Sequence, residues 1–345
     1  MDERAEALAE GLSRYLTRQR RADWTVTGGA RIPGGASRET WRFVAGSGGE
    51  QHGIIVRIDP ETSLIDTDRA LEHAAIDAAY RAGIPAPEPL YLEEDASFIG
   101  RPFSIMAEVA GCSASAESLP PEHLEKIGEQ KWRWLGRIAA LDPAELGLES
   151  VMTLPDPQAC AMEQVDYWAG VIRDDEIHPN PIAEAAVRWL RRNPPPPPQK
   201  LSLVHGDYRT GNFLFSPEGE IRAILDWEMA HIGDPLEDLA WSLDPLWSFN
   251  QPQLAGQLIP HREAIAHWEA ASGLKVDPHA FRWWRVFASV KGIGIWISSS
   301  EDYHHGAAKL PILAIAGWLM TDRQERILCD YLSPHSQHLF PEATA

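Results

Sequence analysis

The residues best suited to chemistry lie in one short stretch of the second half of the chain. Asp207 follows a short apolar run, and Asn212 comes five residues after it. Two further apolar runs, 213–215 and 221–225, flank the turn-forming letters SPEGE, and Asp226 directly follows the second run. This pattern predicts a β-hairpin whose base carries an amide and a carboxylate, with a second carboxylate close by.

The predicted hairpin also defines a candidate metal site. If the hairpin folds about Gly219, Asn212 lies opposite Asp226. Directly opposed residues of antiparallel strands are about 4.5–5.5 Å apart at Cα. An amide oxygen and a carboxylate at that separation can share one hard cation, and Mg²⁺ lies about 2.1 Å from its ligands. We therefore expect these two residues to bind a divalent ion.

Asp207 is expected beside this metal pair without having to bind the ion. A carboxylate in that place can accept the proton of a hydroxyl group while the metal holds the phosphates of a nucleotide. Arg209 offers a permanent positive charge to the phosphoryl group during transfer. The alternative for each residue alone is structural, because aspartate and asparagine in turns often bond the backbone. The ordered spacing of the whole set favours phosphoryl transfer.

This segment resembles the catalytic and metal-binding region of the aminoglycoside phosphotransferase and choline kinase family. HGDYRTGN matches the catalytic loop, LDWE the metal-binding acid, and GDPLEDLAW the stretch that follows. The resemblance implies Asp207 as the catalytic base, and Asn212 with Asp226 as the ligands of Mg²⁺. It also implies that Asp238 braces the loop. Glu228 is expected to assist the metal if the strand continues, because it would then face the same way as the preceding acid.

The resemblance further implies a protein-kinase-like bilobal α+β fold, with a small β-rich N-lobe and a larger, mostly helical C-lobe. In such a fold a loop covers the nucleotide phosphates, and IPGGASRET, which contains Gly34, Gly35 and Ser37, is the candidate. A plain hairpin turn is its alternative. Arg57 stands where most kinases use lysine, and Glu72 on the following helix is its natural partner.

The strand FSIM and the letters AEVAG after it resemble the connection between the lobes of a kinase. The backbone of Met106, Ala107 and Glu108 is then expected to meet the adenine. The predicted cofactors are ATP and Mg²⁺, with GTP as the alternative nucleotide.

The elements that must position these residues change in character along the chain. Residues 1–109 are expected to form the nucleotide-binding lobe, with a leading amphipathic helix over 1–20, followed by strands and one helix over 68–82. Residues 110–345 are expected to form the catalytic and acceptor-binding lobe, in which helices dominate. Its first three helices are predicted over 122–140, 159–171 and 182–192.

Composition narrows the classes of partner and location. The net charge of −19 argues against a nucleic-acid partner, because phosphate backbones need a basic face. No apolar run is long enough to span a bilayer, and no secretory leader is evident. The three cysteines show no metal-ligand spacing and are expected to be free, buried thiols. We therefore expect a cytoplasmic protein without a membrane partner, while the oligomeric state stays open.

The acceptor is the open question. The letters GIPAPEP, LDPAELGL, RWLRRNPPP and FRWWRVFASVKGIGIW are most similar to phosphotransferase domains fused to, or encoded beside, acyl-CoA dehydrogenases. That resemblance implies a hydroxylated small molecule as acceptor, including a hydroxyacyl-CoA. The alternatives are an aminoglycoside-resistance kinase and a nucleotide-binding module without transfer activity. Tryptophans are expected mostly in the core, although some could line an acceptor pocket: Trp241, Trp247, Trp268, Trp283, Trp284, Trp296 and Trp318.

Overall fold

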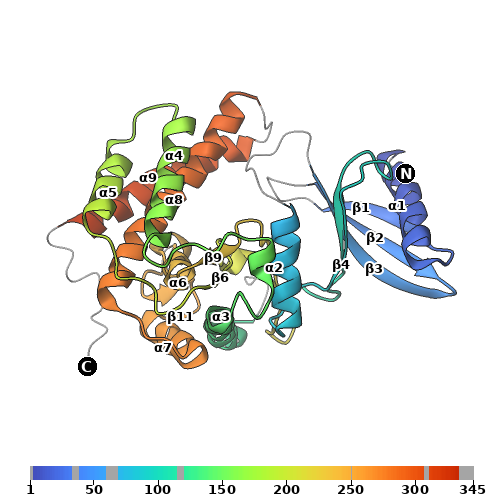
Figure 1. Ribbon diagram of the computed structural model, residues 1–345, viewed down its shortest axis with the longest axis horizontal. Helices are drawn as coiled ribbons and strands as arrows, with labels where there is room; N and C mark the ends of the chain where they lie inside the picture. Colours follow the sequence, from blue (N-terminus) through green and yellow to red (C-terminus); the bar gives the residue numbers. More distant parts are fainter. Residues whose placement is uncertain are drawn as a thin grey trace.

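An antiparallel sheet and a larger group of helices form the two parts of the molecule (Figure 1). The structure, a computed structural model, describes residues 3–32, 39–59, 69–114, 120–249, 251–306 and 311–333. In Figure 1 the sheet and helix α1 lie to the right and the larger group of helices to the left, with helix α2 between them.

Five strands pair in the order β1-β2-β3-β5-β4, every neighbour antiparallel. They are β1 (Thr25–Ile32), β2 (Glu39–Ser47), β3 (Glu50–Ile58), β4 (Pro89–Glu93) and β5 (Phe103–Ala107). Alternate residues of β2 and β3 are buried, as the period of a strand requires. Helix α1 (Glu3–Arg20) packs its apolar stripe, including Leu12 and Tyr15, into the same small core.

Helix α2 (Arg69–Arg81) joins the two parts. Its buried face, including Ala75, Ala78 and Ala79, belongs to the core of the helical part and not to the core of the sheet. Glu72 on the same helix is paired with Arg57 of β3. The division of the chain near residue 109 therefore remains our proposal, since a helix before that position packs with the later part.

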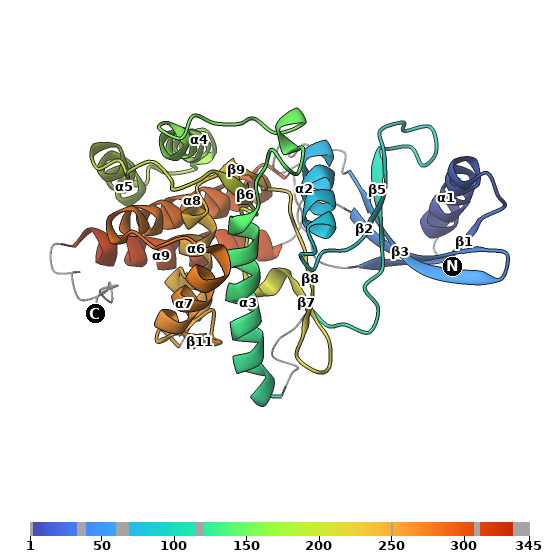
Figure 2. The ribbon, with the colours of Figure 1, turned by 60° about the horizontal axis from the view of Figure 1, so that its bottom comes forward.

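The helical part is built around α8 (Pro278–His304), whose residues from Ala280 to Gly294 are almost all buried. Figure 2 shows α8 and α9 (Pro311–Leu332) side by side, and they share many contacts. The other helices are α3 (Glu122–Ala140), α4 (Cys160–Asp175), α5 (Pro181–Arg192), α6 (Leu236–Ser242) and α7 (His261–Ser272).

Three small two-stranded sheets complete the helical part, and two of them carry the candidate site. Strand β6 (Ser202–Val204) pairs with β9 (His231–Gly233), and β7 (Phe213–Phe215) pairs with β8 (Ile221–Ile224). The third joins β10 (Leu254–Ala255) to β11 (Ile259–Pro260). Single 3₁₀ turns span Leu148–Ser150, Thr210–Asn212 and Pro245–Ser248.

Within the described part of the chain, no helix combines the length and the apolarity needed to cross a bilayer. Cys112, Cys160 and Cys329 are free thiols, as expected, but the expectation of burial holds for Cys160 and is wrong for the exposed Cys329 and the half-buried Cys112.

Candidate active site

A cleft of about 900 Å³ lies between the sheet and the helical part and gathers most of the predicted site. The predicted residues that line it are Arg57, Met106, Glu108, Asp207, Arg209, Asn212, Asp226 and Glu228. Gly34, Gly35 and Ser37 lie outside the described residues, so the phosphate-covering role of that segment stays a prediction.

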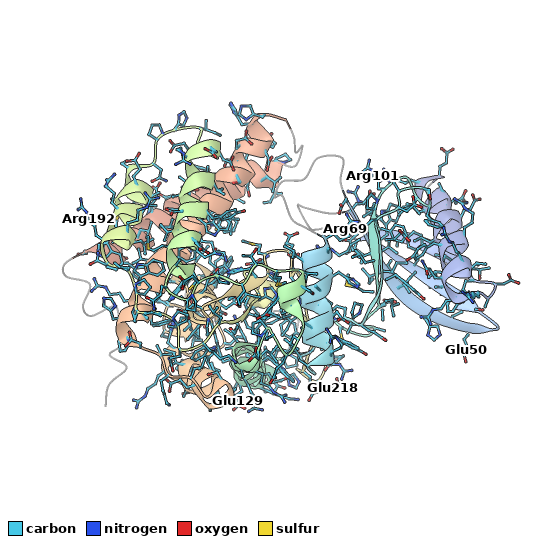
Figure 3. All side chains as sticks on the ribbon, in the orientation of Figure 1. Glu50, Arg69, Arg101, Glu129, Arg192 and Glu218 are labelled. Carbon is cyan, nitrogen blue, oxygen red and sulfur yellow. The ribbon has the colours of Figure 1, made fainter. Side chains whose placement is uncertain are left out.

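Helix α3 holds the tip of the hairpin of β7 and β8 through hydrogen bonds. Lys126 Nζ donates to the Glu218 carbonyl at 3.1 Å, at the tip of the hairpin (Figure 3, where Glu218 is labelled). Gln130 donates to the Gly219 carbonyl at 3.0 Å and accepts from the Ile221 amide at 3.1 Å. A Cβ at Gly219 would lie 2.6 Å from α3, so this close approach needs glycine.

The predicted hairpin register is wrong by one residue. Phe213 pairs with Ile224, and the Leu225 amide donates to the Asn212 carbonyl at 2.7 Å, so Asn212 faces Leu225. The turn is centred on Glu218, since Ser216 pairs with Glu220 across it. The predicted centre of the turn is one residue later, at Gly219. A bulge between Leu214 and Phe215 shifts the pairing of the two strands by one residue, so the register at Asn212 still differs from the predicted one by one residue.

Asp226 reaches the cleft in spite of this shift, because its backbone leaves the ladder with a left-handed φ of 67°. Aspartate is one of the few residues other than glycine that adopts this conformation readily. Its side chain is about one-third exposed, and Oδ1 accepts a hydrogen bond from Arg57 at 3.3 Å.

Donors on both sides hold the carboxylate of Asp207. Oδ2 accepts from the Asn212 amide nitrogen at 2.7 Å and from Arg209 Nε at 3.1 Å. Oδ1 accepts from the indole nitrogen of Trp241 at 2.8 Å. The side chain is 16% exposed, and Asp207 lines the cleft, so it can receive a proton from a bound molecule.

The start of the catalytic loop is fixed by Asp238 and His205. Asp238 accepts the backbone N–H groups of His205 and Gly206 at 2.6 and 2.9 Å, which is the bracing contact expected from the sequence. The His205 ring lies 2.9 Å from the Leu225 carbonyl and accepts from the Asp207 amide at 3.1 Å. Burial lowers the pKa of His205, so the ring is neutral and its Nε2 donates to the carbonyl.

Arg57 connects the sheet to three acids. Its guanidinium lies 2.5 Å from Glu72, 3.3 Å from Asp226 and 3.9 Å from Glu228. The pair with Glu72 is the one expected for a phosphate-anchoring base. Arginine presents several donors in one plane, so it can hold these acids and still direct an N–H group toward the cleft.

The oxygen donors of the site fit a hard divalent cation. The Asn212 amide nitrogen is used by Asp207, so its side-chain oxygen is the atom left for a metal. Asp226 adds a carboxylate to the same cleft, where Arg57 now balances its charge. Amide and carboxylate oxygens are the ligands that Mg²⁺ prefers. The donor set therefore suits Mg²⁺. Strand β8 ends at Ile224, so the strand continuation that would align Glu228 with Asp226 is not found, although Glu228 lies 3.9 Å from Arg57.

Two backbone amides of the segment predicted to meet the adenine are already hydrogen-bonded to other segments. Met106 lies in β5 and is buried, and it lines the cleft with Ala107 and Glu108. However, the amides of Ala107 and Glu108 donate to the carbonyls of Glu88 and Gly53, each at 2.9 Å. These two amides are therefore already used by neighbouring segments, and the contact of this backbone with an adenine stays a prediction. The Glu108 carboxylate itself pairs with Arg42 at 2.6 Å.

Arg209 lies across the floor of the cleft. Its guanidinium is 5.4 Å from the centre of the Trp247 ring, and it is about one-third exposed. A Cβ at Gly211 would lie 2.3 Å from this guanidinium, so the glycine is what allows Arg209 to take this position. The side chain thus combines an aromatic contact with an ion pair to Asp207 in the cleft.

The end of the cleft formed by the helices, where the acceptor is predicted to bind (the acceptor end), is aromatic and partly acidic. The lining residues from α4, α8, α9 and the segment near α6 are Tyr167, Trp168, Val171, Asp175, Trp247, Ile295, Trp296, Asp302, Leu313 and Ala316. Burial, together with repulsion from the neighbouring acids Glu301 and Asp175, raises the pKa of Asp302 to about 6. This end can therefore hold apolar groups and, through its acids, a cation.

The tryptophans divide into the expected two sets, with one exception. Trp268, Trp283 and Trp284 are core residues with at most 1% exposure. Trp241, Trp247 and Trp296 line the cleft. Trp318 on α9 is 79% exposed, so the expectation of burial is wrong there.

Three residues in or next to the catalytic loop make contacts that were not predicted from the sequence. His205 could have been noticed from its place in the HGD motif, and Trp241 from its spacing after Asp238. Lys131 of α3 is fully buried under the loop and donates to Thr210 Oγ1 at 3.1 Å. Burial, followed by repulsion from Arg209, lowers the pKa of Lys131 to about 7. A helical lysine gives no local signal of such burial, because most lysines face water.

A buried ion pair joins α6 to α8. Lys291 Nζ lies 2.9 Å from Glu237, both side chains are 1% exposed, and His231 Nε2 lies 3.1 Å from the other oxygen of Glu237. Burial opposes the charge of Glu237, but attraction to Lys291 and His231 outweighs it and lowers its pKa to about 2. Burial also opposes the charge of His231, yet attraction to Glu237 raises its pKa.

Replacing Lys291 by methionine is therefore expected to destabilise the protein by about 3–5 kcal/mol, since Glu237 would be left as a buried, poorly compensated charge. Urea unfolding at neutral pH measures the change. The double variant Lys291→Met, Glu237→Gln is expected to recover much of the loss. Equal losses in the single and double variants would contradict this explanation.

Comparison with known proteins agrees with this geometry. The profile of the phosphotransferase enzyme family matches residues 28–274. Acyl-CoA dehydrogenase family member 10 of Mus musculus is 34% identical over 195 residues, which are 55% of this chain and 18% of that protein. Family member 11 of Rattus norvegicus is 30% identical over 276 residues, which are 76% of this chain and 34% of that protein. The chain thus spans about a fifth to a third of the length of these relatives.

Solved structures with the same fold cover nearly the whole chain. A candidate aminoglycoside phosphotransferase from Ralstonia eutropha superposes with a TM-score of 0.73 at 21% identity, over 93% of this chain and 97% of that one. An aminoglycoside phosphotransferase in ternary complex with AMP-PNP and hygromycin B gives 0.59 at 17% identity, over 92% and 99%. The kinase-like α+β fold expected from the sequence is thereby confirmed. Because the family profile covers most of its length, the chain belongs to the phosphotransferase enzyme family.

Proposed function

We propose that the chain transfers the γ-phosphate of a nucleoside triphosphate to a hydroxyl group of a small molecule. The observation that carries this proposal is the position of Asp207 in one cleft with Asn212 and Asp226. Its Oδ1 accepts a hydrogen bond from Trp241. A carboxylate oxygen has about two acceptor sites, so a second remains for an incoming hydroxyl group.

In the proposed reaction, Asp207 aligns the hydroxyl group of the acceptor and takes its proton. The hydroxyl oxygen forms a bond to the γ-phosphorus, the bond from that phosphorus to the bridging oxygen breaks, and the nucleoside diphosphate leaves. Arg57 and Arg209 neutralise charge on the phosphates before and during transfer. The products are a phosphate ester and a nucleoside diphosphate.

Asn212 and Asp226 are proposed as the ligands of Mg²⁺, with Glu228 assisting. When bound, the ion would neutralise phosphate charge and orient the triphosphate. ATP is the proposed nucleotide, and a related fold has been solved with AMP-PNP. GTP remains the alternative, because another neighbour was solved as a GDP complex. We also propose a cytoplasmic location, which supplies both cofactors and keeps the three free thiols reduced.

For the acceptor, we propose a hydroxylated molecule with an apolar portion, such as a hydroxyacyl-CoA. The acceptor end presents Val171, Ile295 and Leu313 beside its aromatic rings, which suits a hydrocarbon chain. Relatives of this chain carry the name acyl-CoA dehydrogenase family member, which supports a thioester acceptor.

A second acceptor class is an amine-bearing sugar. Asp175 and Asp302 face the cleft at its acceptor end, and two acids there suit an ammonium group. A related fold was solved with hygromycin B, which makes the class concrete. The acids and the apolar wall therefore support different acceptors, and an experiment has to choose between them.

The test is a screen for acceptor-dependent ADP release with ATP and Mg²⁺. The panel contains hydroxyacyl-CoAs of varied chain length and hydroxyl position, aminoglycosides, choline-like amines and sugars, and mass spectrometry identifies any phosphate ester. We expect a hydroxyacyl-CoA to be phosphorylated, with kcat/KM unchanged in Asp302→Asn. If an amine is the substrate, the same variant should lower its kcat/KM roughly tenfold, which corresponds to a loss of about 1.4 kcal/mol from one hydrogen bond to a charged group.

The remaining rival is a nucleotide-binding module without transfer activity. It predicts that ATP and Mg²⁺ raise the melting temperature while no member of the panel is phosphorylated. That combination would refute the proposed kinase activity. Phosphorylation of any panel member would instead exclude the rival.

A further inference from the structure

Helix α6 presents two side chains to the catalytic loop from one face. Asp238 and Trp241 are three residues apart, so they lie one above the other on the helix surface. Asp238 accepts hydrogen bonds from the loop backbone. Trp241 instead donates, and its partner is the carboxylate of Asp207 at 2.8 Å.

This indole contact decides how the Asp207 carboxylate is turned. Asn212 and Arg209 both donate to Oδ2, whereas Trp241 donates to Oδ1. Without the indole N–H, both remaining donors would bind one oxygen, and the carboxyl plane could rotate about the Cβ–Cγ bond. With the indole N–H, both carboxylate oxygens accept hydrogen bonds, so the carboxyl plane is fixed. The remaining acceptor site on Oδ1 then points in one direction.

The ring of Trp241 is itself immobilised. It is 1% exposed and lies edge to face with Trp247, with ring centres 5.1 Å apart. The ammonium group of Lys291 lies 5.6 Å from the centre of the Trp241 ring. Lys291 is in turn fixed by Glu237, which stands four residues before Trp241 on the same helix. A buried cation and an aromatic edge therefore hold the indole at its donor angle.

We propose that Trp241 is a positioning residue for phosphoryl transfer: its indole N–H turns the Asp207 carboxylate so that Oδ1 faces the acceptor hydroxyl. This inference rests on the proposed function, because it assigns a role to a residue that acts through the proposed base. It makes a distinct statement about kinetics. Loss of the N–H should slow the chemical step and leave the binding of both substrates in place.

The test compares Trp241→Phe with an isosteric replacement of Trp241 by 3-benzothienylalanine, in which sulfur takes the place of the N–H group. A hydrogen bond to a charged group contributes enough to change a rate roughly 10- to 100-fold. We expect kcat to fall by that factor in both variants. The KM of the acceptor and the Kd of ATP should stay within about twofold of the wild type. The benzothienyl variant preserves the volume, so it keeps the test decisive if the phenylalanine variant fails to fold.

Trp268→Phe is the matched control. Trp268 is fully buried in α7, and its indole nitrogen has no hydrogen-bond partner among the described residues. Its kcat should stay within about twofold of the wild type. A wild-type kcat in the benzothienyl variant would overturn the inference, as would an equal fall in Trp268→Phe or a parallel loss of ATP binding. A wild-type chain that phosphorylates no acceptor would instead refute the proposed function, so the two failures are distinguishable.

Discussion

Replacing Asp207 by alanine should lower the rate of phosphoryl transfer by roughly 10²–10⁴-fold, the usual contribution of a positioned general base. Nucleotide binding should be kept, because the described hydrogen bonds of the Asp207 side chain go to Asn212, Arg209 and Trp241, which all lie outside the sheet. Single-turnover kinetics with saturating acceptor measures the rate, and calorimetric titration with a non-hydrolysable ATP analogue measures the binding.

The alanine variant also leaves three donors without their carboxylate, so its stability has to be followed. A loss of about 1–3 kcal/mol is expected from such unpaired groups. Asp322→Ala, which removes an exposed carboxylate of α9 paired with Arg326, serves as the control and should keep full activity. An unchanged turnover in Asp207→Ala would remove the proposed mechanism.

Replacing Asp226 by asparagine should weaken the binding of Mg²⁺ by roughly 10–100-fold and lower turnover accordingly at limiting metal. Asparagine tolerates the left-handed φ of 67° at this position, so the backbone need not change. Alanine at this position would also destabilise the backbone by about 1–2 kcal/mol, so the loss of the metal ligand could not be separated from the loss of stability. Turnover is measured against Mg²⁺ concentration, with thermal unfolding in ATP with and without Mg²⁺ as the binding assay.

Two outcomes of that titration are informative. Rescue of Asp226→Asn at high Mg²⁺ would support a role as metal ligand. A turnover that is independent of Mg²⁺ in the wild type, and that survives a chelator, would contradict the assignment of both Asn212 and Asp226.

Elements with a strong local pattern were predictable from the sequence. The helix expected over 122–140 has the same bounds in the structure, because its apolar residues repeat at helical spacing. Helix α4 begins one residue later than expected and ends four residues later, at Asp175. Strands β4 and β9 were not predicted. All five residues of β4 are half-buried and show no alternation, and β9 has only three residues.

The site shows the same division between local and tertiary information. The order of Asp207, Asn212 and Asp226 along a strand–turn–strand motif was enough to predict that they share one cleft. Their register was not predictable, because a one-residue bulge leaves no mark in the alternation of such short strands. The contact of Trp241 joins residues 34 positions apart, and it depends on how α6 packs on α8.

The packing of α2 has a consequence for how the cleft can open. Ala75, Ala78 and Ala79 tie this helix to the helical part, whereas Arg57 belongs to the sheet. The ion pair between Arg57 and Glu72 therefore connects the sheet to the helical part. On the proposed function, a swing of the sheet that widened the entrance would stretch this 2.5 Å contact, so release of the nucleoside diphosphate would be coupled to loosening of Arg57.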